Sequence, residues 1–90
     1  VTAVIPGLAW PSDLAVSPYG QFVYVAESVR DQVAVIDTSL NEVVYRWPAG
    51  NSATYVDVSS DGRLLYVADS SDAVIVMDAL FSVIFSWLKI

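Results

Sequence analysis

The chain has 90 residues, 56% of them hydrophobic, and a net charge of −6 from ten acidic and four basic side chains. This length allows one small domain at most, and four scattered cations argue against a nucleic-acid partner. The absence of cysteine and histidine excludes disulfides, the usual zinc sites and Ser-His-Asp catalysis from this sequence, so we expect no metal, no cofactor and no catalytic residue in it.

The predicted elements are short strands of β-branched and aromatic residues, separated by turns rich in Gly, Pro, Asp and Ser. A first strand is expected at Val1–Ile5, just before Pro6. Eight more follow in chain order, at Asp13–Ser17, Phe22–Glu27, Gln32–Asp37, Glu42–Trp47, Tyr55–Ser59, Leu64–Asp69, Ala73–Asp78 and Ser82–Leu88.

The last of these elements has a second interpretation. Alternation places Phe81, Val83, Phe85 and Trp87 on one face of a strand, but the polar residues of Leu80–Ile90 also recur at helical spacing. The internal repeat favours the strand. The apolar run that contains it is far shorter than the roughly 20 residues of a bilayer-crossing helix, and Val1 opens on a strand without a basic leader. We therefore expect neither a membrane span nor a signal peptide.

The second group of four strands repeats the first. The run from Phe22 to Ser28 returns 42 positions later as Leu64 to Ser70, and Val33–Asp37 returns after 41 positions as Val74–Asp78. Periods of about 40 to 45 residues with four strands per unit are typical of propeller blades. The repeat therefore predicts an all-β fold made of β-propeller blades.

We expect the whole chain to be a single propeller segment. Residues 11–48 and 53–90 would form two four-stranded antiparallel blades, and residues 1–6 would supply one extra outer strand that belongs to a preceding blade. Two blades leave two apolar faces bare, and about three repeats are normally needed for stability. We therefore expect further blades as partners, either from the same longer chain or from identical subunits that close into a ring.

The residues that recur carry a family resemblance. Tyr24-Val25-Ala26 after the Gly20 turn, followed by Val35-Ile36-Asp37-Thr38, resembles the YVTN-type β-propeller repeat of surface-layer proteins. That resemblance implies a non-enzymatic scaffold, or a binding segment for a protein or glycan, at an extracellular, cell-surface or periplasmic location. The alternative it leaves open is a segment of an enzyme propeller of the quinoprotein dehydrogenase or lactonase type, with its catalytic residues in other blades.

Candidate binding residues lie on the loops at one side of the blades, where function often resides on a rigid scaffold. Trp10 is an indole on a loop where the second blade has Ser52, and it is either a contact residue or a plug that packs the loop. Arg30 and Asp72 stand on the turns after the second strand of each blade. We expect these three residues to contribute to any ligand contact on this loop face.

Two further acidic residues belong to the innermost strands. Asp13 lies at the mouth of the first strand, and Asp57 lies inside the fifth, where the first blade has Ala15. Either carboxylate could bind a cation or a substrate group or accept hydrogen bonds from backbone amides, and we expect Asp13 simply to be exposed. For Asp57 we favour a structural role, in which the carboxylate accepts hydrogen bonds from backbone amides of the neighbouring strand or of the loop before it.

Overall fold

The structure, a computed structural model, describes residues 3–79 and 83–89. Over these residues it contains eight strands and no helix: β1 Pro11–Val16, β2 Phe22–Glu27, β3 Gln32–Asp37, β4 Glu42–Pro48, β5 Ala53–Val58, β6 Leu64–Asp69, β7 Ala73–Asp78 and β8 Val83–Lys89. The strand interpretation of the last element is confirmed at residues 83–89. Residues 80–82 and 90, which also belonged to that prediction, lie outside the described residues.

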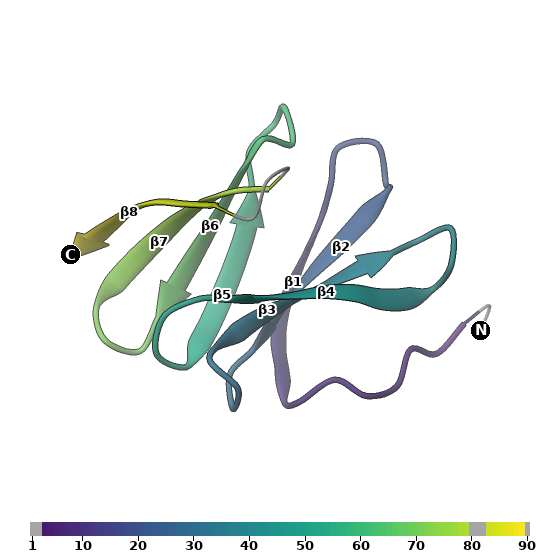
Figure 1. The fold of residues 1–90 in the computed structure, drawn as a ribbon, viewed down its shortest axis with the longest axis horizontal. Helices are drawn as coiled ribbons and strands as arrows, with labels where there is room; N and C mark the ends of the chain where they lie inside the picture. The colour runs from purple at the N-terminus through teal and green to yellow at the C-terminus, as the bar shows by residue number, and fades with distance from the viewer. Residues whose placement is uncertain (1–2, 80–82, 90) are drawn as a thin grey trace.

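The strands form two four-stranded antiparallel sheets, β1-β2-β3-β4 and β5-β6-β7-β8, in which each strand pairs with its neighbour in sequence. Figure 1 shows the two twisted sheets facing one another, with β1 and β5 side by side near the middle of the molecule. The predicted pair of blades is therefore confirmed. We call the two sheets the first and the second blade.

The main core lies between the blades. Alternation along β2 and β3 directs Tyr24, Ala26, Val33 and Val35 of the first blade into the same cluster as Leu65, Val67, Ile75 and Met77 of the second. The opposite face of the first blade carries Val23, Val25, Ala34 and Ile36. These four are the repeat equivalents of Leu65, Val67, Ile75 and Met77. One face of a blade thus packs on the opposite face of the next.

The second and third strands of each blade have the predicted bounds, whereas the innermost strands begin earlier than predicted. β1 starts at Pro11 and β5 at Ala53, and each contains a register shift, between Pro11 and Asp13 in one blade and between Ala53 and Tyr55 in the other. Such a bulge breaks the alternation from which the start of a strand is predicted. The innermost strand is therefore longer than its hydrophobic pattern indicates.

The extra outer strand predicted at Val1–Ile5 is not found in residues 3–8, which form no strand in the structure. Residues 1 and 2 lie outside the described part of the chain. Ile5 and Leu8 instead pack against the cluster that contains Val25 and Ile36, on the face of the first blade turned away from the second blade. The apolar character that suggested a strand at Ile5 serves to cover this face.

Candidate functional site

A loop face is formed by segments 7–10 and 49–52, which lead into the two blades, and by turns 28–31 and 70–72. In each blade, the carboxylate at the end of the second strand holds the incoming segment. Glu27 Oε2 accepts a hydrogen bond from Ala9 N at 2.8 Å, and Asp69 Oδ2 accepts one from Asn51 N at 2.9 Å. Both donors and both acceptors are 42 positions apart. The same anchor is built twice.

Glu27 is the centre of a buried polar cluster. Its side chain has no solvent exposure, and its Oε1 accepts hydrogen bonds from Gln32 Nε2 at 2.9 Å and Arg46 Nε at 3.1 Å. Arg46 also donates through Nη2 to Gly7 O at 2.8 Å. Burial raises the pKa of Glu27, but the hydrogen bonds and the Arg46 charge outweigh burial and lower this pKa below its ordinary value. Glu27 is therefore a structural anion.

The Asp69 side chain is one methylene shorter than that of Glu27, and it accepts hydrogen bonds from groups of the turn that follows it. Its Oδ1 accepts hydrogen bonds from Ser71 N at 3.0 Å, Ser71 Oγ at 2.8 Å and Ala73 N at 3.2 Å. Burial raises the pKa of Asp69, whereas these bonds and the one from Asn51 lower it, and the net shift is downward. Both anchors thus stay ionised at neutral pH and hold loops in place.

The turn after β2 also connects the blades. Asp31 has φ of 55°; its carboxylate accepts a short hydrogen bond from Ser52 N, and its carbonyl accepts one from Ala49 N at 2.9 Å. Asp72 is the repeat equivalent, 41 positions later, and has φ of 64°. Asp72 therefore has the same left-handed backbone conformation as Asp31, and its carboxylate is exposed. In Asp31 this is the conformation in which the residue links the first blade to the loop that leads into the second.

Trp10 stands on the loop face with 73% of its surface exposed, so it does not act as a plug among the described residues. Its φ is 49°, a left-handed conformation that is uncommon for a bulky residue. The Trp10 carbonyl accepts hydrogen bonds from Ser28 N at 3.3 Å and Ser28 Oγ at 3.2 Å, which fix the loop. Arg30 is exposed on the adjacent turn. Both residues are accessible, and their role in ligand contact stays a prediction.

The two acidic residues of the innermost strands have the opposite arrangement to the one predicted. Asp13 Oδ2 accepts a hydrogen bond from Val56 N of β5 at 3.0 Å, so it joins the two blades, and Ser12 Oγ donates to Thr54 O at 2.9 Å beside it. Asp57 is exposed, and its Oδ1 accepts from Val58 N, the next amide along. The backbone anchor expected at Asp57 is therefore found at Asp13. The Asp13 side chain reaches across to an amide of β5, whereas the Asp57 carboxylate bonds to the amide that follows it in its own strand.

The candidate site residues thus fall into two groups. Trp10, Arg30 and Asp72 belong to the loop face, whereas Asp13 and Asp57 lie on the innermost strands and both line a hollow of about 430 Å³ on the second blade. The anchors Glu27 and Asp69 were not among the residues predicted from the sequence. An alignment of the two repeats could have found them, because both are acidic and both end a strand directly before a Ser.

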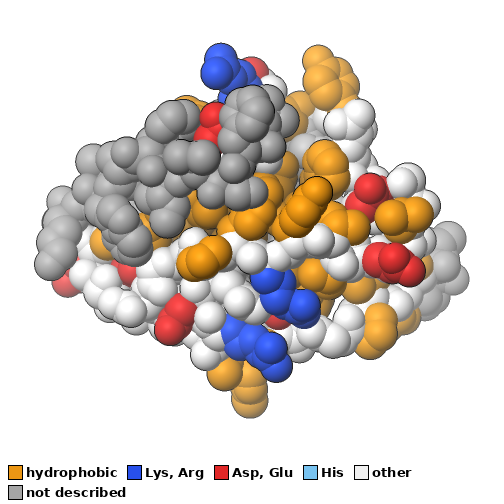
Figure 2. All heavy atoms as spheres, in the orientation of Figure 1, with side chains coloured by type: hydrophobic (Ala, Val, Ile, Leu, Met, Phe, Trp, Pro, Cys, Tyr) orange, Lys and Arg blue, Asp and Glu red, His pale blue; other side chains and the backbone are white. Residues whose placement is uncertain are grey.

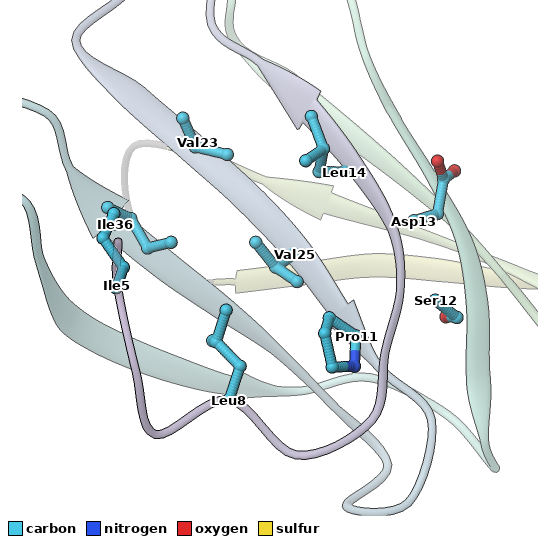
Figure 3. Close-up of a pocket in the computed structure, with 9 residues that line it drawn as sticks. All are labelled: Ile5, Leu8, Pro11, Ser12, Asp13, Leu14, Val23, Val25 and Ile36. Carbon is cyan, nitrogen blue, oxygen red and sulfur yellow. The ribbon is translucent and has the colours of Figure 1, made fainter. Parts of the chain in front are cut away.

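The outward face of each blade carries a hollow. One of about 550 Å³ lies on the first blade, and Figure 3 shows Leu8 and Pro11 in the lower part of the view, with Val25 of β2 between them and Val23. The other, of about 430 Å³, lies on the second blade and is lined by residues that include Tyr55, Asp57 and Tyr66. Because the equivalent inner faces are filled by the neighbouring blade, both hollows have the position of a blade interface.

Within residues 3–79 and 83–89, no three acidic side chains converge in a way that could hold a metal ion. Helices able to cross a bilayer are likewise lacking in that part of the chain. On the face shown in Figure 2, Lys and Arg side chains form no continuous stripe. Among the described residues, carboxylates of the loop face serve as hydrogen-bond acceptors for loop amides.

Comparison with solved structures places this geometry among β-propellers. The chain superposes on hydrazine synthase from Kuenenia stuttgartiensis with a TM-score of 0.88 and 24% identity, over 99% of this chain and 26% of that one. It matches the Cps50 (Swd1) β-propeller domain of Myceliophteria thermophila with a TM-score of 0.87 and 18% identity, over 100% of this chain and 28% of that domain. The fold is therefore that of propeller blades.

Two further proteins share more sequence with the chain. Antigen Lp49 of Leptospira interrogans serogroup Icterohaemorrhagiae serovar copenhageni is 35% identical over 76% of this chain and 18% of its own length. The dihydro-heme d1 dehydrogenase NirN is 26% identical with a TM-score of 0.74, over 83% of this chain and 16% of that one. No protein-family model matches the sequence. The chain spans less than a third of each of these four proteins.

Proposed function

We propose that these two blades are a non-enzymatic binding segment of a larger cell-surface or secreted β-propeller of the YVTN type. The observation that carries this proposal is the structural use of the loop-face carboxylates. Glu27, Asp31 and Asp69 each accept a hydrogen bond from a backbone amide of the loops that lead into the blades. A general acid or base needs a carboxyl group that is available to a substrate. These groups stabilise a platform instead, and the platform presents Trp10 and Arg30.

The comparisons support the location and the partners in a general way. The similarity to a leptospiral antigen favours a surface protein, and the similarity to propellers favours packing against further blades. We propose that those blades belong to the same longer chain, with identical subunits as the alternative. The ligand of the loop face would be a protein or a glycan, and an exposed indole and an exposed guanidinium on one loop face suit either, because both side chains bind polar and apolar groups at once.

The proposal can be tested by replacing Trp10 with a photo-crosslinking amino acid in the full-length protein on intact cells. A protein or glycan adduct at this position is expected. The matched control carries the same amino acid at Ser60, which is exposed on the turn between β5 and β6, at the end of the second blade opposite the loop face. Equal labelling at both positions, or no macromolecular adduct at position 10, would contradict the proposal. Trypsin treatment of the same cells should release peptides cleaved after Arg30 and Arg63 if the propeller is at the surface.

An enzyme propeller is the second candidate, and the similarity to the dihydro-heme d1 dehydrogenase NirN is the observation that favours it. In that case the two blades would be wall segments, and other blades would supply the catalytic residues. Small-molecule adducts at Trp10 in the crosslinking experiment, without protein or glycan, would support this second function.

A further inference from the structure

A separate hollow lies on the side of the first blade opposite the loop face. It has a volume of about 470 Å³ and is lined by two turns, Tyr19 to Phe22 from the β1–β2 connection and Asp37 to Ser39 from the β3–β4 connection. Both turns belong to one blade. Unlike the hollows on the outward sheet faces, this one does not have the position of a blade interface, and it would stay open in a complete propeller.

The second blade supplies an internal comparison for Tyr19, because Asp61 stands at the equivalent position 42 residues later. Asp61 Oδ1 accepts hydrogen bonds from Ser59 Oγ at 2.7 Å and Arg63 N at 3.0 Å. The two turns otherwise agree, since Gly20 N donates to Ser17 O at 2.9 Å as Gly62 N donates to Ser59 O at 2.9 Å. A tyrosine cannot supply the carboxylate bonds of Asp61. The turn itself therefore gives no reason for an aromatic ring at Tyr19.

The other turn of the hollow is held by hydrogen bonds and carries a negative charge. Asp37 Oδ1 accepts hydrogen bonds from Ser39 N at 2.8 Å and Ser39 Oγ at 2.6 Å, and Thr38 Oγ1 ties the two turns together by donating to Gly20 O at 2.6 Å. The bond from the Ser39 hydroxyl, with that from the Ser39 amide, lowers the pKa of Asp37. Asp37 is the one charged residue among the seven that line the hollow.

We propose that this hollow binds an arginine side chain of a partner protein. A guanidinium can stack on the face of the Tyr19 ring and pair with the Asp37 carboxylate at the same time, because it is planar and carries donors at its edge. The Asp37 charge and the absence of any cation in the lining favour a positively charged ligand. This site is independent of the loop face and of the function proposed for it.

The test is an NMR titration of the protein with a short acetylated peptide, Gly-Arg-Gly-Arg-Gly, and with the same peptide carrying lysine or glutamate in place of arginine. We expect shifts of the amides of residues 19–22 and 37–39 with the arginine peptide, weaker binding of the lysine peptide and none of the glutamate peptide. Tyr19→Leu should weaken the arginine affinity about two- to fivefold through loss of the ring face. Asp37→Asn should weaken it by a similar factor of about two to five.

The matched control is Asp61→Asn, the equivalent turn of the second blade, which should leave the affinity unchanged. Tyr19 is almost fully exposed, so Tyr19→Leu should fold normally and decides the test even if Asp37→Asn is unstable. Unchanged affinity in Tyr19→Leu, shifts confined to the loop face, or absence of binding would each overturn the proposal. A neutral oligosaccharide that shifts the same amides while the arginine peptide does not would also overturn it.

Discussion

Glu27 and Asp69 show how one methylene group changes what an anchor can hold. Each is the last residue of the second strand of its blade, and each accepts a hydrogen bond from an amide of the segment that leads into that blade. Glu27 reaches across to Arg46 and Gln32, so its cluster joins the incoming segment to β3 and β4. Asp69 turns back to the amides of its own turn. The longer side chain therefore connects elements, and the shorter one stabilises a single turn.

Replacing Glu27 with Gln should lower the free energy of unfolding by about 1–3 kcal/mol. The amide keeps the size of the side chain but loses the charge, and Gln32, Arg46 and Ala9 lose a charged acceptor. Urea unfolding of the intact protein would measure the effect. Glu42→Gln is the control, because Glu42 is an exposed glutamate at the start of β4. Equal stability of the two variants would contradict the anchoring role of Glu27.

The same anchors predict how stability depends on pH. The pKa values of Glu27 and Asp69 are lowered in the folded protein, so their contribution is complete above the unfolded-state values of about 4.3 and 3.9. As pH falls below these values, the unfolded chain binds protons first. The contribution is then lost as pH falls through the lower folded-state values. Urea midpoints should be level between about pH 5 and 7 and fall below about pH 4.5. In Glu27→Gln this acid decline should be shallower.

Gly50 is a position where a side chain would meet its neighbours. Its φ is 70°, and an added Cβ would clash with Asp69 Oδ2 and Ile75 Cδ1. Gly20 has a similar φ of 72° but no atom within 4 Å of the added Cβ. Gly50→Ala should therefore cost about 1–3 kcal/mol more than Gly20→Ala, because overpacking adds to the conformational cost that both share. Thermal unfolding of the two variants would test this, and equal melting temperatures would refute the clash.

The contact between β1 and β5 depends on short polar side chains rather than on a hydrogen-bonded ladder. Asp13→Ala leaves the part-buried Val56 amide without its acceptor and should lower the free energy of unfolding by about 1–2 kcal/mol. Asp57→Ala should lower it by less than Asp13→Ala does, because the Asp57 carboxylate bonds to the amide that follows it in the same strand. Chemical denaturation of both variants gives the comparison. A larger loss for Asp57→Ala would restore the structural role that its position in the sequence suggests.

Strand identity could be predicted from the sequence because Phe22–Glu27 and Ala73–Asp78 carry continuous β-branched and aromatic patterns, and because each pattern occurs twice. The bulges before Asp13 and Tyr55 could not be predicted, since they depend on the register of the partner strand. The same limit applies to the site. The sequence shows that Asp13 and Asp57 are on innermost strands, but which of them faces the neighbouring blade is decided by how the sheets pack.

At the level of the whole molecule, each blade uses one face for the preceding blade and the other for the following one. Ala26 is buried between the two blades, and its equivalent Ala68 lies on the outward face of the second blade. If a further blade covers that face, Ala68→Glu in the full-length protein should cost more than about 2 kcal/mol, as expected for a buried charge. Ala26→Glu should cost at least as much. Ser60→Glu, on an exposed turn, is the control and should be nearly neutral in thermal unfolding.

The strictly sequential pairing of strands has a consequence for synthesis on the ribosome. Every ladder of the first sheet joins neighbours in the chain, and its last strand ends at Pro48. A nascent chain that has emerged as far as Pro48 thus already contains each backbone partner of that sheet, and local contacts of this kind form quickly. Its apolar face toward the second blade stays uncovered until residues up to Ala79 follow. We expect the blades to form one after another in the order of translation, and nascent chains whose emerged part ends between residues 48 and 79 to be the ones that chaperones bind.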